Sequence, residues 1–538
     1  MKLRTSLCIA MLAISAWTIG CSSGGGGAAG GAMLHVGAGA EPQNLDPYRV
    51  TGHNEHRVLT SLFEGLTTLN QETLAVEPGA AQSWTVSPDG LVYTFKLQPN
   101  AKWSDGTQVT AKDFVYGWKR HLSARLGSEY TYMLWCIKNA EEYTKGTLTD
   151  FSQVGVKAID DTTLEVSLKY PVPAFLTMHI HYAWFPVLQS NVEAFGAIDD
   201  PNNTKWTRAG NMISNGPFKL EEWSPNQIIR VVRNEHYWDA ANVKLDGVEF
   251  YPISDLATEE REFRSGRLDL TESLLSTKIE TYRRDNPDLL HIDPLIGTYF
   301  YRLNTTRKPL DDPKVRRALA MSIDRQSICD SVLFSAVVPA SAFTPPGLAG
   351  YTPESSIPYN VEEARKLLTE AGYPNGEGMR PLDILFNESE DHRRIAEAIQ
   401  DMWKKNLNIE ARPTQQEWKV YLNSLTTLDY DVARSAWIAD YLDPINYLEC
   451  FETGGGNNRT GWSSPEFDAL VEKTRLSPEQ SVRFPLLQQA EQLLLNEAPL
   501  APIYSYRQRF LLAPRVRGLK SNMLGYLNYK TFSLADAQ

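Results

Sequence analysis

The sequence predicts a mixed α/β (α+β) fold that divides into two or three lobes. The chain has 538 residues, of which 42% are hydrophobic and 22% are charged, as in ordinary globular proteins. Because a single hydrophobic core stops growing at roughly 250–300 residues, a chain of this length normally folds as several lobes. Segments with strand periodicity alternate with segments of helical periodicity, and neither a repeat nor a clear linker separates them. We therefore expect the chain to cross between its lobes several times.

Four segments predict β-strands. Residues 92–97 (VYTFKL) and 164–168 (LEVSL) alternate between apolar and polar side chains, which is typical of a strand with one buried face. Residues 227–232 and 248–251 predict two further strands.

Three segments predict helices with one apolar face. Residues 391–406 place an apolar stripe on one side, formed by Ile395, Ile399, Met402 and Trp403. Residues 361–371 form a second candidate, and Gly372 follows them as a C-terminal cap. Residues 481–497 form a third, with a stripe of Leu and Ala.

The first twenty residues have the order of a secretory signal peptide. Lys2 and Arg4 give a basic start, and a mostly apolar run follows over residues 7–19. This run is too short to cross a bilayer core of about 30 Å as a permanent helix. We therefore expect residues 1–20 to be a signal peptide.

Cys21 directly follows this expected signal peptide. Its surroundings resemble a bacterial lipobox, in which the cysteine is lipidated and becomes the new N-terminus, although Thr18 stands where leucine is usual. The rest of residues 21–32 is Gly, Ser and Ala, a composition typical of a flexible tether. We expect a protein anchored by a lipid on Cys21 at the periplasmic or cell-surface side. Ordinary secretion with a chance cysteine is the alternative.

Charge and cysteine content exclude several classes of protein. The net charge is −12 and no run of Lys or Arg occurs, so nucleic acid is not an expected partner. Beyond Cys21 the cysteines are Cys136, Cys329 and Cys450, at wide spacing and without a CxxC pair. Neither a zinc site nor a redox dithiol is therefore indicated. We expect three buried free thiols, with one disulfide as the alternative.

Sequence motifs for catalysis are missing. There is no Gly-rich phosphate loop and no Gly-x-Ser-x-Gly nucleophile elbow. His179 and His181 would share one side of a strand, but two histidines without a third ligand are more often core or surface residues than a metal site. The sequence thus predicts a protein that is not an enzyme and that holds no metal or cofactor.

One apolar segment carries charges. Residues 432–441 (VARSAWIADY) set Arg434, Trp437 and Asp440 into an otherwise apolar run. A charge in such a run must be paired or must bind something, because isolated burial of a charge is costly. Aromatic residues also gather nearby, and they suit the walls of a ligand cleft. This pattern predicts that residues 432–441 contribute to a binding site.

Short motifs in a fixed order carry a family resemblance. They are EPQNLDP (41–47), LFEGL (62–66), AKWSDGT (101–107), DFVY (113–116), SNGPF (214–218), RNEHYW (233–238), FRSGRLD (263–269) and VRRAL (315–319). Each is modest alone, but this number in one order is specific. Over residues 33–538 the sequence resembles the oligopeptide-binding proteins of bacterial ABC importers, which belong to family 5 of the extracellular solute-binding proteins. The oligopeptide branch is favoured by residues 403–407, 416–419 and 432–441.

The resemblance implies a periplasmic-binding-protein fold with two lobes around a hinge and a third, smaller lobe. Lobe I would contain residues 33–64, 188–296 and 507–538. Lobe II, the extra lobe, would contain residues 65–187, and lobe III residues 297–506. Ligand would close the lobes around itself, as in other periplasmic binders.

The resemblance also implies which residues bind the ligand. Asp440 would hold the α-ammonium of a peptide, and Trp437 and Tyr130 would line the pocket of its first residues. Arg434 and His392 match two of the basic positions that meet the C-termini of peptides of different lengths.

A third such position, usually basic, aligns near Leu425.

The partners implied are short peptides, the membrane permease subunits of an ABC importer and the membrane itself through the N-terminal lipid. We expect a monomer. The alternatives are the same fold binding a nickel chelate, haem or a sugar, or a secreted hydrolase. Asp440 argues against ligands that have no free amine.

Overall fold

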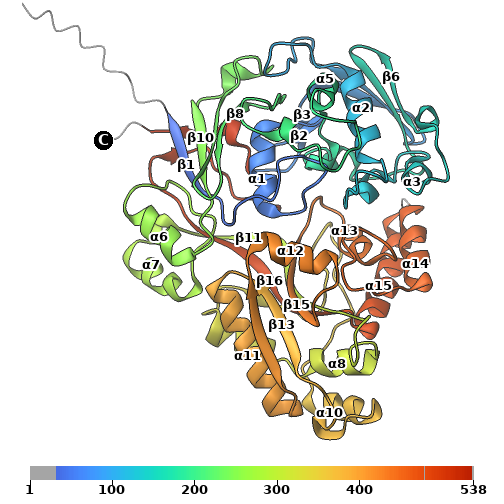
Figure 1. Cartoon of the computed structure of the whole chain (residues 1–538), viewed down its shortest axis with the longest axis vertical. Coiled ribbons are helices and arrows are strands. Elements are labelled where there is room, and N and C mark those ends of the chain that lie inside the picture. Colours follow the sequence, from blue (N-terminus) through green and yellow to red (C-terminus); the bar gives the residue numbers. More distant parts are fainter. Residues whose placement is uncertain (1–31, 478, 536–538) are drawn as a thin grey trace, which may run out of the picture. The chain divides into compact units, whose positions relative to one another are not determined.

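Three β-sheets of four to six strands organise the chain (Figure 1). The structure is a computed structural model, and it describes residues 32–477 and 479–535. The expected signal peptide, the expected lipid site Cys21 and residues 22–31 of the expected tether lie outside the described residues. The described residues belong to one compact unit of the chain, which begins at Ala32.

The first sheet joins the start of the described chain to its middle. Its strand order is β1 (Met33–Gly37), β10 (Gly247–Tyr251), β9 (Ile228–Arg233) and β8 (Phe218–Ser224). β1 pairs with β10 in parallel, whereas the other neighbours are antiparallel. Helix α1 (His53–Leu62) contacts β8 of this sheet.

The second sheet is an antiparallel sheet. Its order is β4 (Ala81–Val86), β5 (Val92–Leu97), β7 (Thr163–Ser167) and β6 (Val156–Asp160). In β5 the alternating side chains Tyr93, Phe95 and Leu97 are buried, as strand periodicity requires. Helix α2 (Ala111–His121) contacts β6, and a capping box of Thr110 and Asp113 begins the helix.

The third sheet has six strands and carries most of the candidate site. Its order is β12 (Val338–Pro339), β16 (Leu500–Leu511), β11 (Leu290–Leu303), β15 (Val432–Ile438), β13 (Leu382–Asn387) and β14 (Ala411–Gln416). The helices that accompany it are α8 (Pro313–Met321), α10 (Val361–Glu370), α11 (Glu390–Leu407), α12 (Trp418–Thr426), α14 (Pro465–Arg475) and α15 (Gln480–Glu497).

Shorter elements make up the rest of the described α-helices and β-strands. They are β2 (Thr67–Leu69), β3 (Val76–Pro78), α3 (Ala140–Thr144), α4 (Phe175–Met178), α5 (Gln189–Glu193), α6 (Leu256–Arg264), α7 (Ile279–Asp285), α9 (Arg325–Ser327), α13 (Ile445–Leu448), β17 (Val516–Arg517) and β18 (Ser533–Leu534). No helix in the described part of the chain is both long and apolar enough to cross a membrane.

The long strands β11 and β16 run antiparallel beside each other (Figure 1). Their pairing shifts register between Pro294 and Thr298. Before the shift, Leu511 of β16 packs in a separate cluster with Phe263 and Tyr282. After it, both strands form the centre of the third sheet. The implied lobe boundaries, 296/297 and 506/507, fall near this shift, and the division into lobes stays a prediction.

The predicted strands and helices are confirmed. The four expected strands correspond to β5, β7, β9 and β10, and the three expected helices to α11, α10 and α15. The helix α10 is followed by Ala371 and then by Gly372, whose φ of 90° is a left-handed conformation that favours glycine. The expectation of free thiols is also confirmed, because Cys136, Cys329 and Cys450 are buried and unpaired.

One strand prediction is wrong. His179 and His181 lie in the turn between α4 and the 3₁₀ helix η3 (Tyr182–Trp184), not on a strand. The reason is local, since the Nδ1 atom of His181 accepts a hydrogen bond from the backbone N–H of Ala183 and so caps this short helix. Both rings are buried, as the core interpretation expected, although His181 also reaches the candidate site.

A buried ion pair joins the segment before α1 to α2. The guanidinium of Arg120 donates to both carboxylate oxygens of Asp46, with Nη1 at 2.9 Å from Oδ1, and both side chains are at most 2% exposed. The guanidinium also lies 5.5 Å from the ring centre of Tyr48. A paired, desolvated charge of this kind becomes costly when one partner is removed.

We expect Asp46→Asn to lower the free energy of unfolding by about 3–5 kcal/mol, because it leaves the buried charge of Arg120 without its carboxylate. Urea unfolding followed by circular dichroism measures this change. The matched control is Asp161→Asn, whose carboxylate pairs with Lys112 at the surface and should leave the midpoint nearly unchanged. Equal effects of the two substitutions would contradict the prediction.

Candidate functional site

A cavity of about 380 Å³ lies against the third sheet. This volume falls within the roughly 300–1,000 Å³ typical of small-molecule sites. Its walls include residues from the segments 51–57, 180–182, 387–392, 434–440 and 504–510, which are far apart in the sequence. All five residues that the sequence analysis predicted for ligand binding line it, namely Tyr130, His392, Arg434, Trp437 and Asp440.

The strand β15 presents a free edge to this cavity. On one side it pairs with β11 along its whole length, from 432 to 438. On the other side β13 pairs only with Val432 and Ala433, and within residues 32–477 and 479–535 no strand pairs with 434–438 on that edge. The N–H of Ala439, just after β15, donates to the carbonyl of Ile296 within β11. Along an antiparallel strand, the N–H and C=O groups of successive residues point alternately toward and away from the neighbouring strand. Because Ala439 bonds to β11, the N–H and C=O groups of Ala436 and Ile438 point away from β11, toward the free edge.

The two faces of β15 carry different groups. Arg434 shares a face with Tyr299 and Tyr301 of β11, and its guanidinium lies 5.0 Å from the ring centre of Tyr299. Ser435 and Trp437 lie on the opposite face, because successive side chains of a strand alternate. The side chains of a peptide paired with the free edge would therefore meet Arg434 on one face of the sheet and Ser435 and Trp437 on the other.

Asp440 stands just after β15 as a largely buried carboxylate, with 12% of its side chain exposed. Burial, and secondly the charge of Glu449, raises the pKa of Asp440 to about 8. Its nearest basic group is Nε2 of His181, 3.5 Å from Oδ1, and no lysine or arginine pairs with it in the described part of the chain. Nδ1 of His181 accepts a hydrogen bond, so Nε2 carries the proton of the neutral ring and faces the carboxylate.

Asn446 holds Asp440 and Trp437 in place. Its Oδ1 accepts hydrogen bonds from the indole Nε1 of Trp437 and from the backbone N–H of Asp440, both at 3.0 Å. Its amide nitrogen lies 3.4 Å from Oδ2 of Asp440. Sequence analysis did not find Asn446, because nothing in its own segment indicates that it reaches back to β15.

Tyr130 comes to the same end of the cavity from a distant segment. Its ring stacks against Trp437 at 6.5 Å between centroids and lies 4.6 Å from the ring of His181. The rings of His181 and His56 are stacked in turn, at 5.8 Å. The structure therefore brings Asp440, Trp437 and Tyr130 together with His181, which the sequence analysis interpreted as a core or surface residue, and with His56.

Arg434 and His392 are brought together elsewhere in the cavity. The hydroxyl of Tyr299 lies 3.4 Å from Nδ1 of His392, under the guanidinium of Arg434. Arg434 donates to Asn387 and to the hydroxyl of Tyr506, and it has no carboxylate partner in the described residues. Burial, and then the charge of Arg434, holds the pKa of His392 well below its usual 6.5. Arg434 therefore supplies the positive charge here, and His392 a neutral ring.

Leu425 also lines the cavity, but it packs in an apolar cluster that includes Tyr421 and Leu422. The basic group expected near this position is thus replaced by an apolar wall. Another cation, Arg302 of β11, lines the cavity instead. Sequence analysis missed Arg302, because it follows the aromatic residues 299–301 without a signal of its own.

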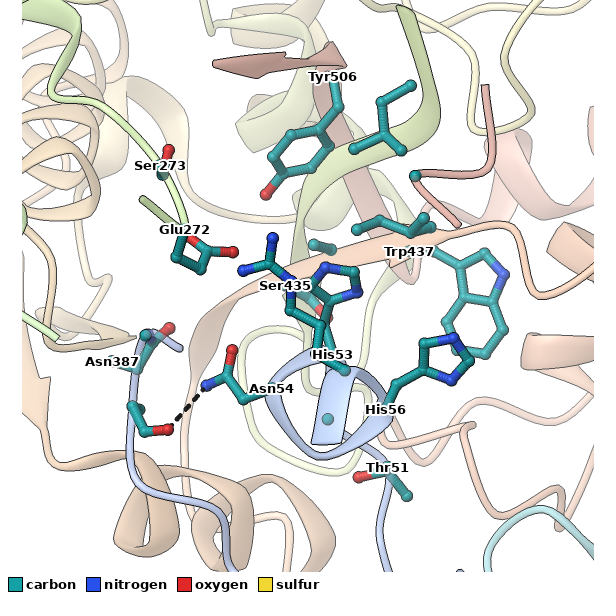
Figure 2. Close-up of a pocket in the computed structure, with 18 of the residues that line it drawn as sticks. Thr51, His53, Asn54, His56, Glu272, Ser273, Asn387, Ser435, Trp437 and Tyr506 are labelled. Atoms are coloured by element: carbon teal, nitrogen blue, oxygen red, sulfur yellow. Dashed lines mark hydrogen bonds between the residues drawn. The ribbon is translucent and has the colours of Figure 1, made fainter. Parts of the chain in front are cut away.

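The wall opposite β15 is the start of α1. Figure 2 shows Thr51, His53, Asn54 and His56 there, with Trp437 among the residues around the same cavity. The side-chain amide of Asn54 donates to the carbonyl of Ala40 at 3.3 Å and so holds this wall. The described residues contain no group of three or more His, Cys, Asp or Glu that could hold a metal ion.

Comparisons with known proteins agree with this geometry. The family model of bacterial extracellular solute-binding proteins, family 5 (middle), matches residues 75–459. The oligopeptide-binding protein OppA of Bacillus subtilis is 35% identical over 96% of this chain and 97% of its own. The periplasmic murein peptide-binding protein MppA of Escherichia coli is 37% identical over 90% and 89%.

Solved structures extend the likeness to three dimensions. OppA of Haemophilus influenzae in complex with the peptide RPPGFSPFR matches with a TM-score of 0.88, at 31% identity, over 94% of this chain and 99% of its own. E. coli MppA matches with a TM-score of 0.89 at 35% identity, over 93% of this chain and 98% of its own. The unliganded open form of MppA scores 0.62, at 35% identity, over 94% of this chain and 98% of its own. The present arrangement is therefore closer to the peptide-bound OppA than to the open form.

The matched family consists of binding proteins of transport systems and not of enzymes, in agreement with the sequence analysis. Its α/β solute-binding fold is the fold that the strands and helices of this chain adopt. The chain belongs to family 5 of the bacterial extracellular solute-binding proteins.

Proposed function

We propose that the protein captures short peptides outside the cytoplasm and delivers them to the membrane subunits of an ABC importer. The observation that carries this proposal is Asp440, a largely buried carboxylate just after a free strand edge, which has no lysine or arginine partner among the described residues and whose nearest basic group is His181. A buried carboxylate needs a cation, and the α-ammonium of a peptide is a cation that every peptide with a free N-terminus carries. Ligands without an amine, such as sugars, would leave Asp440 uncompensated.

The free edge of β15 explains how peptides of different sequence would bind. An extended peptide would add a strand to the sheet and pair with the main-chain groups of Ala436 and Ile438. Main-chain hydrogen bonds do not depend on the side chains of the ligand. Trp437 and Tyr130 would contact the first residues of the peptide next to its anchored N-terminus.

Arg434 and His392 would meet the C-terminus. Arg434 offers a guanidinium that no carboxylate in the described residues neutralises, and such a group binds a carboxylate strongly and with defined geometry. The neutral ring of His392 would add a hydrogen bond. Because Leu425 is apolar, a third basic contact from that position is not part of the proposal.

Ligand binding would stabilise the closed arrangement of the proposed lobes, which are 33–64 with 188–296 and 507–538, then 65–187, and 297–506. The cavity walls come from segments of all three. A ligand that bridges the start of α1 and β15 binds the closed form better than the open one, and this difference shifts the population toward closure. The TM-scores of 0.88 and 0.62 support a closed arrangement in this structure.

We also propose that Cys21 carries a lipid that anchors the mature protein, as a monomer, to the outer face of a membrane. The order of residues 1–21 supports this proposal, and the Gly- and Ser-rich residues 22–31 would give the anchored domain reach. An anchored binding protein remains near its importer, which raises its effective concentration there.

The first prediction tests the ammonium anchor. Asp440→Asn keeps the shape and removes the charge, and loss of one partner of a desolvated ion pair costs about 2–5 kcal/mol. At about 1.4 kcal/mol per factor of ten, tripeptide affinity should fall roughly 30-fold to several-thousand-fold in calorimetric titrations. N-acetylated tripeptides should bind the wild type poorly and should lose little further affinity in the variant.

Asp429→Asn is the matched control, since this carboxylate pairs with Arg307 at the surface and does not line the cavity. It should leave tripeptide affinity unchanged. Equal binding of free and acetylated tripeptides by the wild type would rule out Asp440 as the anchor.

A second prediction concerns pH. Because the pKa of Asp440 is raised to about 8 in the empty closed form, binding of an ammonium requires this carboxyl to lose its proton. Affinity should therefore fall as pH is lowered below 8, by up to about tenfold per pH unit. It should also fall above pH 8, where the amine of the peptide, with a pKa of about 7.7–8.0, becomes neutral.

Calorimetry from pH 5 to 9 would give this profile, and titration in two buffers with different ionisation enthalpies would show proton release near pH 7. In Asp440→Asn the decline toward acid should disappear, which separates Asp440 from its neighbours His181 and Glu449. A wild-type affinity that stayed constant from pH 8 to pH 5 would refute the assignment.

The third prediction concerns the anchor. Cys21→Ala removes the thiol to which a lipid would be attached, so the protein should move from the membrane fraction to the soluble extracytoplasmic fraction. Fractionation followed by immunoblotting measures this, and Cys136→Ala serves as a control that keeps Cys21. Retention of the Cys21→Ala variant on membranes at the wild-type level would disprove lipid anchoring.

A further inference from the structure

Arg302 is one of several arginines in the wall of the cavity, apart from Arg434. It lies on β11 opposite Ala433 of β15 and is 3% exposed. Residues opposite each other in an antiparallel pair share a face, so Arg302 is on the face of Ser435 and Trp437. Arg434, one position further along β15, is on the other face.

The fold holds the guanidinium of Arg302 but does not neutralise it. Nε donates to Oγ of Ser435 at 3.1 Å, and Nη1 donates to the carbonyl of Asn457 at 3.0 Å. The group also lies over the rings of Phe300 and Phe451, at 5.2 and 5.7 Å. Within the described residues Nη2 makes no hydrogen bond, and no carboxylate forms an ion pair with this side chain.

Arg325 is a buried arginine away from the cavity, and its hydrogen bonds can be compared with those of Arg302. It too lacks a carboxylate partner in the described part of the chain, but each of its three guanidinium nitrogens donates to a backbone carbonyl, of Pro502, Ile323 and Ala320. Arg325 does not line the cavity, whereas Arg302 does. Arg302 thus combines a guanidinium nitrogen without a hydrogen bond in the described residues with a place in the cavity wall, and Arg325 has neither feature.

The side chains around Arg302 do not neutralise its positive charge, so the electrostatic potential at its guanidinium is positive. Arg459 lies close by and is already paired with Glu129. Burial, and after it the positive charge of Arg459, lowers the pKa of Arg302. The side chains of Tyr430, Tyr421 and Cys450 also lie near it, and they are neutral at pH 7 because burial raises the pKa of each. A buried cation in such surroundings is stabilised by an anion that enters with the ligand.

We propose that Arg302 forms a second anion-binding subsite, which selects peptides with an acidic side chain on the Ser435–Trp437 face of β15. This inference rests on the proposed peptide binding. Side chains of an extended peptide alternate between the two faces, so neighbouring ligand residues cannot both reach Arg302. In a tripeptide the preference for an acidic residue should therefore depend on position. It is distinct from recognition of the terminal carboxylate by Arg434, because the two guanidinium groups lie on opposite faces.

Calorimetry with six tripeptides would test the proposal. Glutamate is placed at the first, second or third position of trialanine, and each peptide is compared with its glutamine counterpart, which has nearly the same size. Because truncation of a desolvated ion pair is costly, the glutamate peptide should bind about tenfold or more tightly at the position that faces Arg302. Arg302→Met should reduce the ratio of the glutamate-peptide affinity to the glutamine-peptide affinity to about one.

Arg507→Gln is the matched control. It removes one positive charge from the cavity wall at an exposed residue of β16, so the glutamate-to-glutamine ratio should persist. If Arg302→Met unfolds at a lower temperature than the assay allows, Arg302→Gln keeps a donor for Ser435 and should also abolish the ratio. A wild type without a glutamate preference at any position, or a preference that survives both substitutions of Arg302, would overturn the subsite. If the wild type bound none of the six peptides, the proposed function itself would fail, which is a distinguishable result.

Discussion

The antiparallel pairing of β11 with β16 is the interaction on which the candidate site depends. After its register shift near Pro294, β11 continues into the third sheet and fixes β15 through pairs from Gly297 with Ile438 to Leu303 with Val432. In this way one strand sets the positions of Trp437 and Arg434, and it also carries Arg302 itself. The partner strand β16 adds Tyr506, which accepts a hydrogen bond from Arg434. A displacement of β11 would therefore change both walls that a ligand meets.

The site combines this rigid frame with charges that the chain itself does not neutralise. Asp440, Arg434 and Arg302 line one cavity, and none of them forms an ion pair with an oppositely charged lysine, arginine or carboxylate in the described residues. Buried charges of this kind disfavour the empty closed form. A zwitterionic peptide, as proposed, would remove this penalty at both of its ends, so that closure and recognition would share one source of free energy.

Local sequence patterns were sufficient for four strands, three helices and the first members of the site. Strand alternation in β5 and the apolar stripe of α11 depend on neighbouring residues, and charges within the apolar run of β15 pointed to Arg434 and Asp440. Asn446 and Arg302 could not be found in this way, because their roles depend on contacts with distant segments. His181 was assigned to a strand, since periodicity does not reveal that its ring caps a 3₁₀ helix and faces Asp440.

The unpaired edge of β15 has a consequence beyond ligand binding. An open strand edge is a template on which other protein chains can add strands, and such edges promote aggregation. Here residues 434–440 line a cavity whose other walls include His53 and Tyr130, so a long or folded chain has little access to the edge. The enclosure of the cavity would thus also protect the protein from association through its own sheet.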